Sequence, residues 1–184
     1  LDASGRWIDG NFIRWQNGSV RPIGGWTLRK ATATATAPRG MVAWVDHSAV
    51  THIAVGTHNK LYALNQGSAV QDITPSGFTA GSVDAPANYG FGGQTYGNDP
   101  YGSPRDAAVP TPATTWSLDT FGQNLVACSS SDGKIYEWQL STSAVAQLLS
   151  NAPTGNNAMM VTDERFVFAL ASSGNPQKIN LSLI

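Results

Sequence analysis

Apolar and polar residues alternate in short runs along almost the whole chain, and Gly, Pro, Asn and Asp interrupt these runs at intervals of about 8–12 residues. This pattern is typical of many short antiparallel strands. The segment most like a helix, residues 143–149, is short, lacks a strong cap and is followed by Asn-Ala-Pro, so we expect a strand or a turn there. The pattern therefore predicts an all-β protein.

The strongest local prediction is a β-hairpin near the start of the chain. Two strand-like segments, residues 11–15 and 19–23, flank Asn17-Gly18, a dipeptide that favours the two-residue turn of a hairpin. Pro22 places its strand at the edge of a sheet, because proline has no N–H to donate to a neighbouring strand.

The predicted register places Arg14 opposite Arg21, and like charges in this position destabilise a hairpin by up to about 1 kcal/mol. An anionic partner would relieve the repulsion: either Asp9 or Asp2 of the same chain, or a carboxylate on a neighbouring subunit. The surrounding region is basic, which indicates either a solvated face with local salt bridges or a surface that faces a polyanion. Six of the eleven Lys and Arg residues lie in the first forty positions: Arg6, Arg14, Arg21, Arg29, Lys30 and Arg39.

A sequence unit recurs through the rest of the chain. Residues 44–64 and 117–138 each contain an Asp, an apolar strand, a polar turn and then Lys-Leu-Tyr or Lys-Ile-Tyr. A third copy, residues 161–181, contains Lys178-Ile179 at the corresponding place. We therefore expect three copies of one antiparallel unit.

The spacing of these units is close to that of β-propeller blades. When Ile53, Val126 and Val167 are aligned, the step from the second unit to the third is 41 residues, near the period of about 40–45 of a four-stranded blade. The step from the first unit to the second is 73 residues, because a Gly/Tyr/Pro-rich insertion lies between about residues 76 and 112. The predicted fold is a partial β-propeller of antiparallel blades.

Two parts are expected along the chain. Residues 1–38 form the hairpin and a linker, in which the ATATATAP stretch at 31–38 is either an exposed strand or a linker, and residues 39–184 form the propeller-like blades with their insertion. A closed propeller has about 4–8 blades, so two and a half units cannot close. The missing sheets would lie beyond Ile184, if the chain is a fragment of a longer one, or in another chain.

The insertion carries aromatic residues separated by small ones between residues 88 and 105. Rigid aromatic rings on a pliable backbone suit a contact surface, although a loop packed against its own domain is the alternative. Stacking on single-stranded nucleic acid is disfavoured, because only Arg105 supplies positive charge nearby. The residues that we expect to contact other subunits, in the hairpin and the insertion, are Arg14, Arg21, Tyr89, Phe91, Tyr96, Tyr101 and Arg105.

Composition narrows the function classes. Hydrophobic residues make up 41% of the chain and charged residues only 12%, and the net charge of -1 gives no general attraction to nucleic acid or acidic membranes. No apolar run approaches the roughly 18 residues of a membrane helix. A single cysteine, Cys128, excludes an internal disulfide and a Cys-rich zinc site, and we interpret it as a small buried strand residue.

No catalytic, cofactor-binding or metal-binding pattern is present. The two glutamates, Glu137 and Glu164, have no second carboxylate at short spacing, so a glycosidase pair is not indicated. Asp132-Gly133 resembles a hairpin turn more than a calcium loop, and the glycines of the insertion match no phosphate-binding motif. The scattered histidines are interpreted as surface and edge residues: His47, His52 and His58.

The order of several segments carries a family resemblance. Residues 5–26 with their Gly-Gly-Trp corner, the insertion that ends in YGSPR, and the run from 115 to 138 followed by NAP and ERFVFALASSGNPQKI resemble tail structural proteins of tailed bacteriophages. Such proteins are similar to the propeller-bearing nozzle or tail-tube-end components of short tails. In such relatives the segment at 174–176 is expected to run into a Trp-containing strand, whereas here the chain continues to LSLI.

The resemblance implies a structural component of the virion tail, without catalytic residues or cofactors. It implies a homo-oligomeric ring that contacts an adaptor, a portal-proximal ring or fibres, and that lines the path of DNA exit.

The alternative is a receptor- or glycan-binding propeller of a tail fibre or secreted lectin, whose aromatic residues stack on sugars. Only Tyr62 and Tyr136 occupy equivalent positions, and we interpret both as structural. A glycoside hydrolase propeller is disfavoured because the carboxylate pair is missing.

Overall fold

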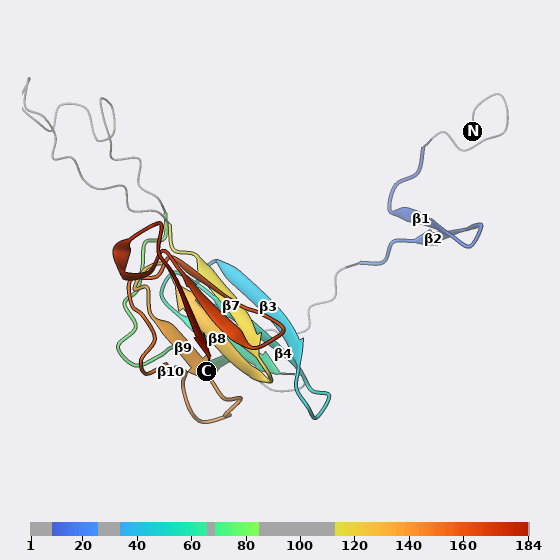
Figure 1. Cartoon of the computed structure of the whole chain (residues 1–184). Helices are drawn as coiled ribbons and strands as arrows, with labels where there is room; N and C mark the ends of the chain where they lie inside the picture. The colour runs from blue at the N-terminus through green and yellow to red at the C-terminus, as the bar shows by residue number, and fades with distance from the viewer. Residues whose placement is uncertain (1–8, 26–33, 66–68, 85–112, 184) are drawn as a thin grey trace, which may run out of the picture. The chain divides into compact units, whose positions relative to one another are not determined.

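The computed structural model describes residues 9–25, 34–65, 69–84 and 113–183 (Figure 1). Their regular elements are β-strands apart from a short 3-10 turn, η1 (Ser172–Gly174), so the all-β prediction is confirmed. The strands form four antiparallel sheets, and no helix among the described residues is long enough to span a bilayer. The chain divides into a small unit, Leu1–Ala31, and a larger one, Thr32–Ile184.

The small unit contains the predicted hairpin, which is confirmed with its register. Strands β1 (Ile13–Gln16) and β2 (Ser19–Pro22) are antiparallel, and Arg14 pairs with Arg21. Asn17 and Gly18 both have positive φ, at 51° and 72°, as a type I′ turn requires.

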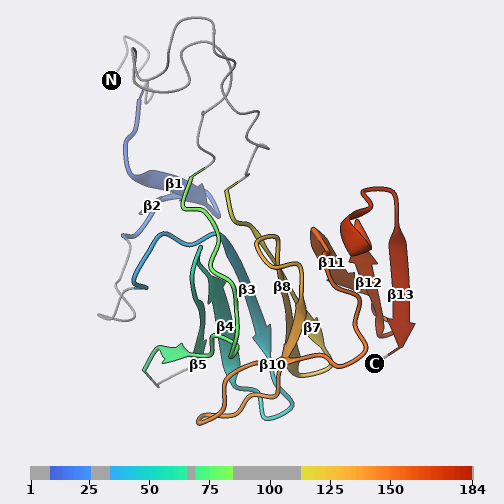
Figure 2. The ribbon, with the colours of Figure 1, turned by 90° about the vertical axis from the view of Figure 1, so that its left-hand side faces the viewer.

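The larger unit contains three meanders, which we call sheets 1, 2 and 3 (Figure 2). Each repeated sequence unit corresponds to one sheet. The strands of sheet 1 are β3 (Gly40–Val45), β4 (Thr51–Gly56), β5 (Leu61–Asn65) and β6 (Gln71–Asp72). Those of sheet 2 are β7 (Trp116–Phe121), β8 (Asn124–Ser129), β9 (Ile135–Trp138) and β10 (Gln147–Leu148), and those of sheet 3 are β11 (Ala158–Val161), β12 (Phe166–Leu170) and β13 (Ile179–Leu183).

Sheet 2 lies between the other two sheets and is buried on both faces. Along β8, Leu125 and Ala127 belong to the core shared with sheet 1, whereas Val126 and Cys128 belong to the core shared with sheet 3. Successive side chains of a strand point to opposite faces, which explains why β8 is apolar at consecutive positions. The prediction that Cys128 is a buried strand residue is confirmed.

The core between sheets 1 and 2 is built around tryptophans whose N–H groups are satisfied. Trp116 Nε1 donates to the carbonyl of Thr57 at 2.6 Å, and Trp44 Nε1 donates to the carbonyl of Gln123 at 2.9 Å. Gly56 faces the Trp116 ring so closely that an added Cβ would lie 2.4 Å from it. A side chain at position 56 is therefore excluded by packing.

The strand pairing identifies equivalent positions in the three sheets. The third strand of each sheet begins directly after a Lys, at Leu61, Ile135 and Ile179. These three residues pair with Gly56, Cys128 and Leu170 of the second strands, so the three pairs are equivalent.

The same pairing corrects the predicted alignment of the second strands. Ile53, Leu125 and Val167 each lie three residues before the second-strand member of an equivalent pair, so they are equivalent to one another. The sequence alignment placed Val126 in this set, which was wrong by one residue. Four residues (57–60) separate Gly56 from Leu61, whereas six (129–134) separate Cys128 from Ile135, and this difference in the length of the connection hid the true register.

Residues 143–149 form a turn and the short strand β10, and Asp132-Gly133 form a turn between β8 and β9, both as expected. Residues 34–38 are not in a strand, which favours the linker interpretation of this part of the ATATATAP stretch. The rest of that stretch, 31–33, lies outside the described residues.

Candidate assembly surfaces

Sheet 3 has an exposed apolar face on the side that points away from sheet 2. Along β12, Val167 and Ala169 are buried against sheet 2, so the alternate residues of this sheet point outward. We define the outer face of sheet 3 by its largest apolar residues: Met160 (47% exposed), Ile179 (62%), Leu181 (55%) and the half-buried Phe168 and Leu170. Contiguous exposed apolar residues of this kind mark interaction sites.

Equivalent residues in the other sheets show that this face is normally covered. Leu61 in sheet 1 is 0% exposed because sheet 2 packs on it, and Ile135 in sheet 2 is 1% exposed because sheet 3 packs on it. Ile179 is 62% exposed. Among the described residues, no further sheet packs on sheet 3 in the way that sheet 3 packs on sheet 2.

Sheet 1 is open at the opposite end. Met41 is 71% exposed and Val45 57% exposed on the side that points away from sheet 2, which we call the outer face of sheet 1. The residues equivalent to Met41 are Leu118, which packs against the first core, and Met159, which is 5% exposed. The stack of sheets thus has an uncovered apolar patch at each end.

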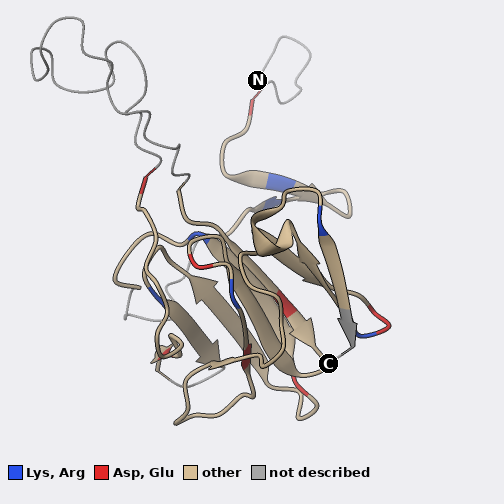
Figure 3. Ribbon diagram, turned by 60° about the vertical axis from the view of Figure 1, so that its left-hand side comes forward, with Lys and Arg blue, Asp and Glu red and all other residues tan. Residues whose placement is uncertain are grey.

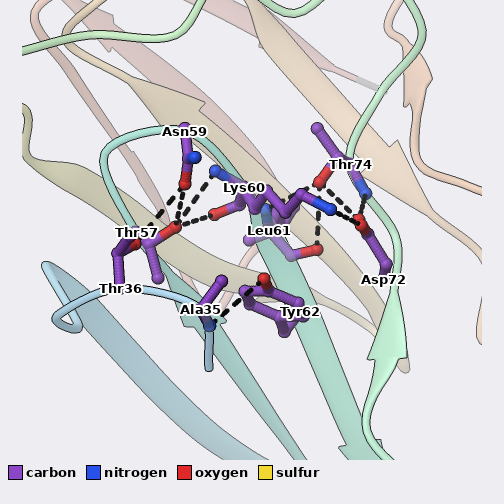
Figure 4. A network of polar contacts seen from close by, with 9 residues as sticks. All are labelled: Ala35, Thr36, Thr57, Asn59, Lys60, Leu61, Tyr62, Asp72 and Thr74. Carbon is purple, nitrogen blue, oxygen red and sulfur yellow. Dashed lines mark hydrogen bonds and ion pairs between the residues drawn. The ribbon is translucent and has the colours of Figure 1, made fainter. Parts of the chain in front are cut away.

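Part of the outer face of sheet 1 is covered by a polar network (Figure 4). The backbone N–H of Ala35 lies 3.5 Å from the Tyr62 hydroxyl, and Tyr62 is only 8% exposed. Nearby, Lys60 forms an ion pair of 2.6 Å with Asp72, which ties β5 to β6. The hydrogen bond and charge of Asp72 raise the pKa of Lys60, which therefore stays protonated. These contacts hold Ala35 and β6 against β5.

A groove of about 400 Å³ opens between sheets 2 and 3, beside β13. Its walls are formed by Ile135 and residues 149–153 on one side, and by Val167, Ala169 and Asn180 on the other. Of the described residues that line it, none is charged. The groove therefore suits an uncharged occupant.

The edge of sheet 3 beside this groove is also open. In sheets 1 and 2 the third strand pairs with a fourth, β6 or β10, whereas β13 is the outermost strand that the structure describes in sheet 3. An unpaired edge strand is a template for another strand.

Two carboxylates and the cysteine of the larger unit lie in structural surroundings. Asp132 accepts a hydrogen bond of 2.5 Å from the Tyr136 hydroxyl, and burial together with this bond raises the pKa of Tyr136. Asp119 accepts a bond of 2.9 Å from the N–H of Val161 and so links sheet 2 to sheet 3. Burial, with a smaller contribution from Asp132, raises the pKa of Cys128 to about 12, so its thiol is a poor nucleophile.

The histidine prediction is wrong for His52, which is buried at 4% exposure. Its Nε2 lies 3.0 Å from Asp46 Oδ2, and its ring stacks on Trp44 with 5.4 Å between centroids. The bond to His52 lowers the pKa of Asp46. His47 is exposed and His58 half-buried, and in the parts of the chain that the structure describes no three His, Cys, Asp or Glu side chains gather as metal ligands.

Arg14 and Arg21, the predicted contact residues of the hairpin, have the predicted register. Arg14 and Arg21 are exposed and opposite each other, and neither takes part in an ion pair among the described residues. The Asp9 carboxylate accepts a hydrogen bond from the N–H of Gly10 at 2.7 Å rather than pairing with an arginine. Of the two anionic partners considered within the chain, Asp9 is thus not engaged, and Asp2 lies outside the described residues.

The predicted contact residues of the insertion lie outside the described residues: Tyr89, Phe91, Tyr96, Tyr101 and Arg105. Its two flanks are described and lie together, because the N–H of Thr114 donates to the carbonyl of Ser82 at 3.1 Å. The flank also contributes Phe78, which stacks on Trp116 with 5.2 Å between ring centroids. The insertion therefore begins and ends at one place beside the first core.

Comparison of the chain with family models, with curated proteins and with solved structures found no match. Its function must therefore be inferred from the surfaces described above.

Proposed function

We propose that the chain is a structural protein that assembles with other subunits by stacking its outer sheets against theirs. The observation that carries the proposal is the exposure of Ile179, at 62%, at a position where Leu61 and Ile135 are buried by the next sheet. In sheets 1 and 2 this face is covered by the next sheet, and we infer that a sheet of another subunit covers it in sheet 3. The uncovered Met41 at the other end supplies a complementary surface.

A propeller-like arrangement of the sheets is the architecture that fits this proposal best. The first strands of successive sheets lie against one another, since β7 contacts both β3 and β11, as the inner strands of neighbouring blades do around an axis. A contact between two different faces of one subunit generates a ring when its rotation closes. Closed propellers have about 4–8 blades, so the three sheets that the structure describes in the larger unit need further sheets to close a ring.

Within that class, we propose a component of a bacteriophage virion tail, a nozzle-like or hub-like ring through which DNA leaves. The sequence resemblance of the hairpin, the insertion flanks and the repeated units supports this assignment. Charged residues are sparse on the three sheets, which suits surfaces that assemble rather than bind a polyanion tightly (Figure 3). Arg14 and Arg21 would then contact acidic side chains of an adjoining tail protein.

The buried aromatic residues argue against the glycan-binding alternative. Trp44, Trp116 and Trp138 are all within the first core, and each donates its N–H to a carbonyl of the chain. Tyr62 and Tyr136 are also buried. None of these rings is available to stack on a sugar.

The proposal is tested by native mass spectrometry and electron microscopy of the full chain over a range of concentrations. We expect rings or higher oligomers, and we expect Ile179→Lys to dissociate them. Leu148→Lys is the matched control, because Leu148 has a similar exposure of 55% but lies on sheet 2. A wild-type chain that stays monomeric at every concentration, alone and with its tail partners, would contradict the proposal.

A further inference from the structure

We propose that the paired arginines of the hairpin, Arg14 and Arg21, bind the carboxylates of Asp163 and Glu164 in a second copy of the chain. Asp163 and Glu164 lie in the turn of residues 162–165 between β11 and β12, which we call the acidic turn. This inference rests on the proposed assembly function and deepens it, because it names the partner of the two arginines.

The hairpin offers two positive charges that the described residues of its own unit leave unpaired. Arg14 and Arg21 are exposed and directly opposite each other, so both side chains project from one face of the hairpin. The carboxylate of Asp9, the acidic residue described in this unit, accepts from the N–H of Gly10 instead. Like charges at opposed positions repel each other, and a carboxylate that accepts from both guanidinium groups removes this repulsion.

The acidic turn offers two adjacent negative charges on a closed backbone. The N–H of Arg165 donates to the carbonyl of Thr162 at 2.9 Å, and the N–H of Phe166 donates to the Thr162 hydroxyl at 3.2 Å. Asp163 and Glu164 are exposed within this turn, and neither takes part in an ion pair among the described residues.

The other charges of the larger unit single out this turn. Arg165 follows the two carboxylates in sequence, but its guanidinium lies over the Phe121 ring of sheet 2, 6.0 Å from the ring centroid. The remaining acidic residues that the structure describes in this unit each lie in a hydrogen bond or ion pair with another residue of the chain: Asp46, Asp72, Asp84, Asp119, Asp132 and Glu137. The acidic turn is therefore the counterpart that matches an unpaired pair of arginines.

The position of the acidic turn in the stack favours a second copy as the partner. Ahead of β3, the N–H of Ala35 lies 3.5 Å from the Tyr62 hydroxyl, so the chain enters the larger unit at the outer face of sheet 1. In the proposed assembly this face meets sheet 3 of the next copy, across one sheet contact of about 10 Å. Sheet 3 of the same copy is two such contacts away, because sheet 2 lies between. The point where the hairpin is tethered is thus nearer to the neighbour's sheet 3 than to its own.

The test reverses the charges of the two sides in separate chains. A hairpin variant carries Arg14→Glu and Arg21→Glu, a turn variant carries Asp163→Lys and Glu164→Lys, and self-association of the full chain is followed by sedimentation velocity. Each variant alone places like charges at the proposed contact, so we expect the concentration of half-association to rise about tenfold or more.

An equal mixture of the two variants restores opposite charges at every contact of an alternating assembly. The new glutamates of one chain meet the new lysines of the other, and the original arginines meet the original carboxylates. We expect the mixture to associate within about threefold of the wild type. Raising NaCl from about 50 to 500 mM should weaken association of the wild type but not of either variant alone.

A single substitution separates partner binding from a structural role within the hairpin. Arg14→Glu places a carboxylate opposite Arg21, and an opposite-charge pair stabilises a hairpin. A role confined to the hairpin predicts unchanged or stronger association of this variant, whereas the proposed contact predicts association weaker by about threefold or more. The substituted positions are exposed, so the circular dichroism of each variant should match that of the wild type.

The outcomes separate this inference from the proposed function, which Ile179→Lys tests by itself. Full association of either charge variant alone, or no recovery in the mixture, would overturn the inference even if Ile179→Lys dissociates the rings. Recovery only in a chain that carries both sets of substitutions would show that the contact forms within one chain, and it would overturn the inference as well. Recovery in the mixture, together with an Ile179→Lys variant that stays assembled, would support the arginine contact and refute sheet stacking.

Discussion

Replacing Ile135 or Ile179 by Ala removes the same atoms from two equivalent positions with opposite exposure. Ile135 is 1% exposed at the contact of sheets 2 and 3, and Ile179 is 62% exposed on the outer face of sheet 3. Both residues begin the third strand of their sheet and follow a Lys. The loss of strand propensity is common to both variants. The difference between their free energies of unfolding therefore measures the stability gained when this position is buried by the next sheet.

The expected magnitude follows from the burial of the two side chains. Ile→Ala removes three carbon groups, worth about 0.8 kcal/mol each when buried, so the transfer contribution at Ile135 is about 2.4 kcal/mol. The cavity left behind increases the loss, and substitutions of this type cost about 2–5 kcal/mol. At Ile179 less than half of the residue is buried, so we expect a loss of about 1 kcal/mol and no cavity.

Urea unfolding followed by tryptophan fluorescence provides the measurement, with the monomeric chain and linear extrapolation to water. The Ile135→Ala variant should be less stable than Ile179→Ala by about 1.5 kcal/mol or more, with unchanged m-values. Equal losses for the two variants would refute the equivalence of the sheets and the idea that one of them lacks its cover.

Three further predictions concern single groups in the larger unit. Gly56→Ala brings a Cβ against the Trp116 ring and should destabilise the fold by about 1–3 kcal/mol in thermal unfolding, and an unchanged melting temperature would contradict the packing described. The Cys128 thiol, with a pKa raised to about 12, should react with a thiol reagent at pH 8 only after unfolding, and rapid labelling of the native chain would show that it is accessible. Since the bond to His52 lowers the pKa of Asp46 below its usual 3.8, the Asp46 carboxylate stabilises the fold above that pH and loses this effect as pH falls through the lower value. Asp46→Asn should therefore reduce the acid dependence of stability, measured as urea midpoints from pH 5 to about 2, and an unaltered dependence would exclude this role.

The features that could be predicted from the sequence are those determined by local chemistry. Asn17-Gly18 determines the hairpin turn and, through it, the pairing of Arg14 with Arg21, because a two-residue turn leaves no freedom of register. The Lys-Leu-Tyr and Lys-Ile-Tyr segments located the third strands, since each follows a short polar turn. Strand alternation and turn residues were sufficient for the fold class.

Features that depend on contacts between sheets could not be read in this way. The alignment of the second strands was wrong by one residue because six residues separate Cys128 from Ile135 where four separate Gly56 from Leu61, and the apolar pattern gives no sign of this difference. His52 was assigned to the surface because histidine is polar, and the sequence does not show that its ring stacks on Trp44 and contacts the Asp46 carboxylate. The exposure of Ile179 was not evident either, since it follows a Lys as the buried Leu61 and Ile135 do.

One departure from the repeat does carry information about assembly, once the pairing is known. Asn180 stands where sheets 1 and 2 have Tyr62 and Tyr136, and in isolation this substitution is an ordinary polar replacement. The pairing shows that position 180 faces sheet 2. The Asn180 side chain donates a hydrogen bond of 2.7 Å to the Ser172 hydroxyl and does not fill the space as a tyrosine ring would. A tyrosine at this position would fill space that Asn180 leaves open as a groove between sheets 2 and 3. The open groove, the open edge of β13 and the open outer face lie on the same sheet, so among the described residues the departure from the repeat coincides with the place where cover is missing.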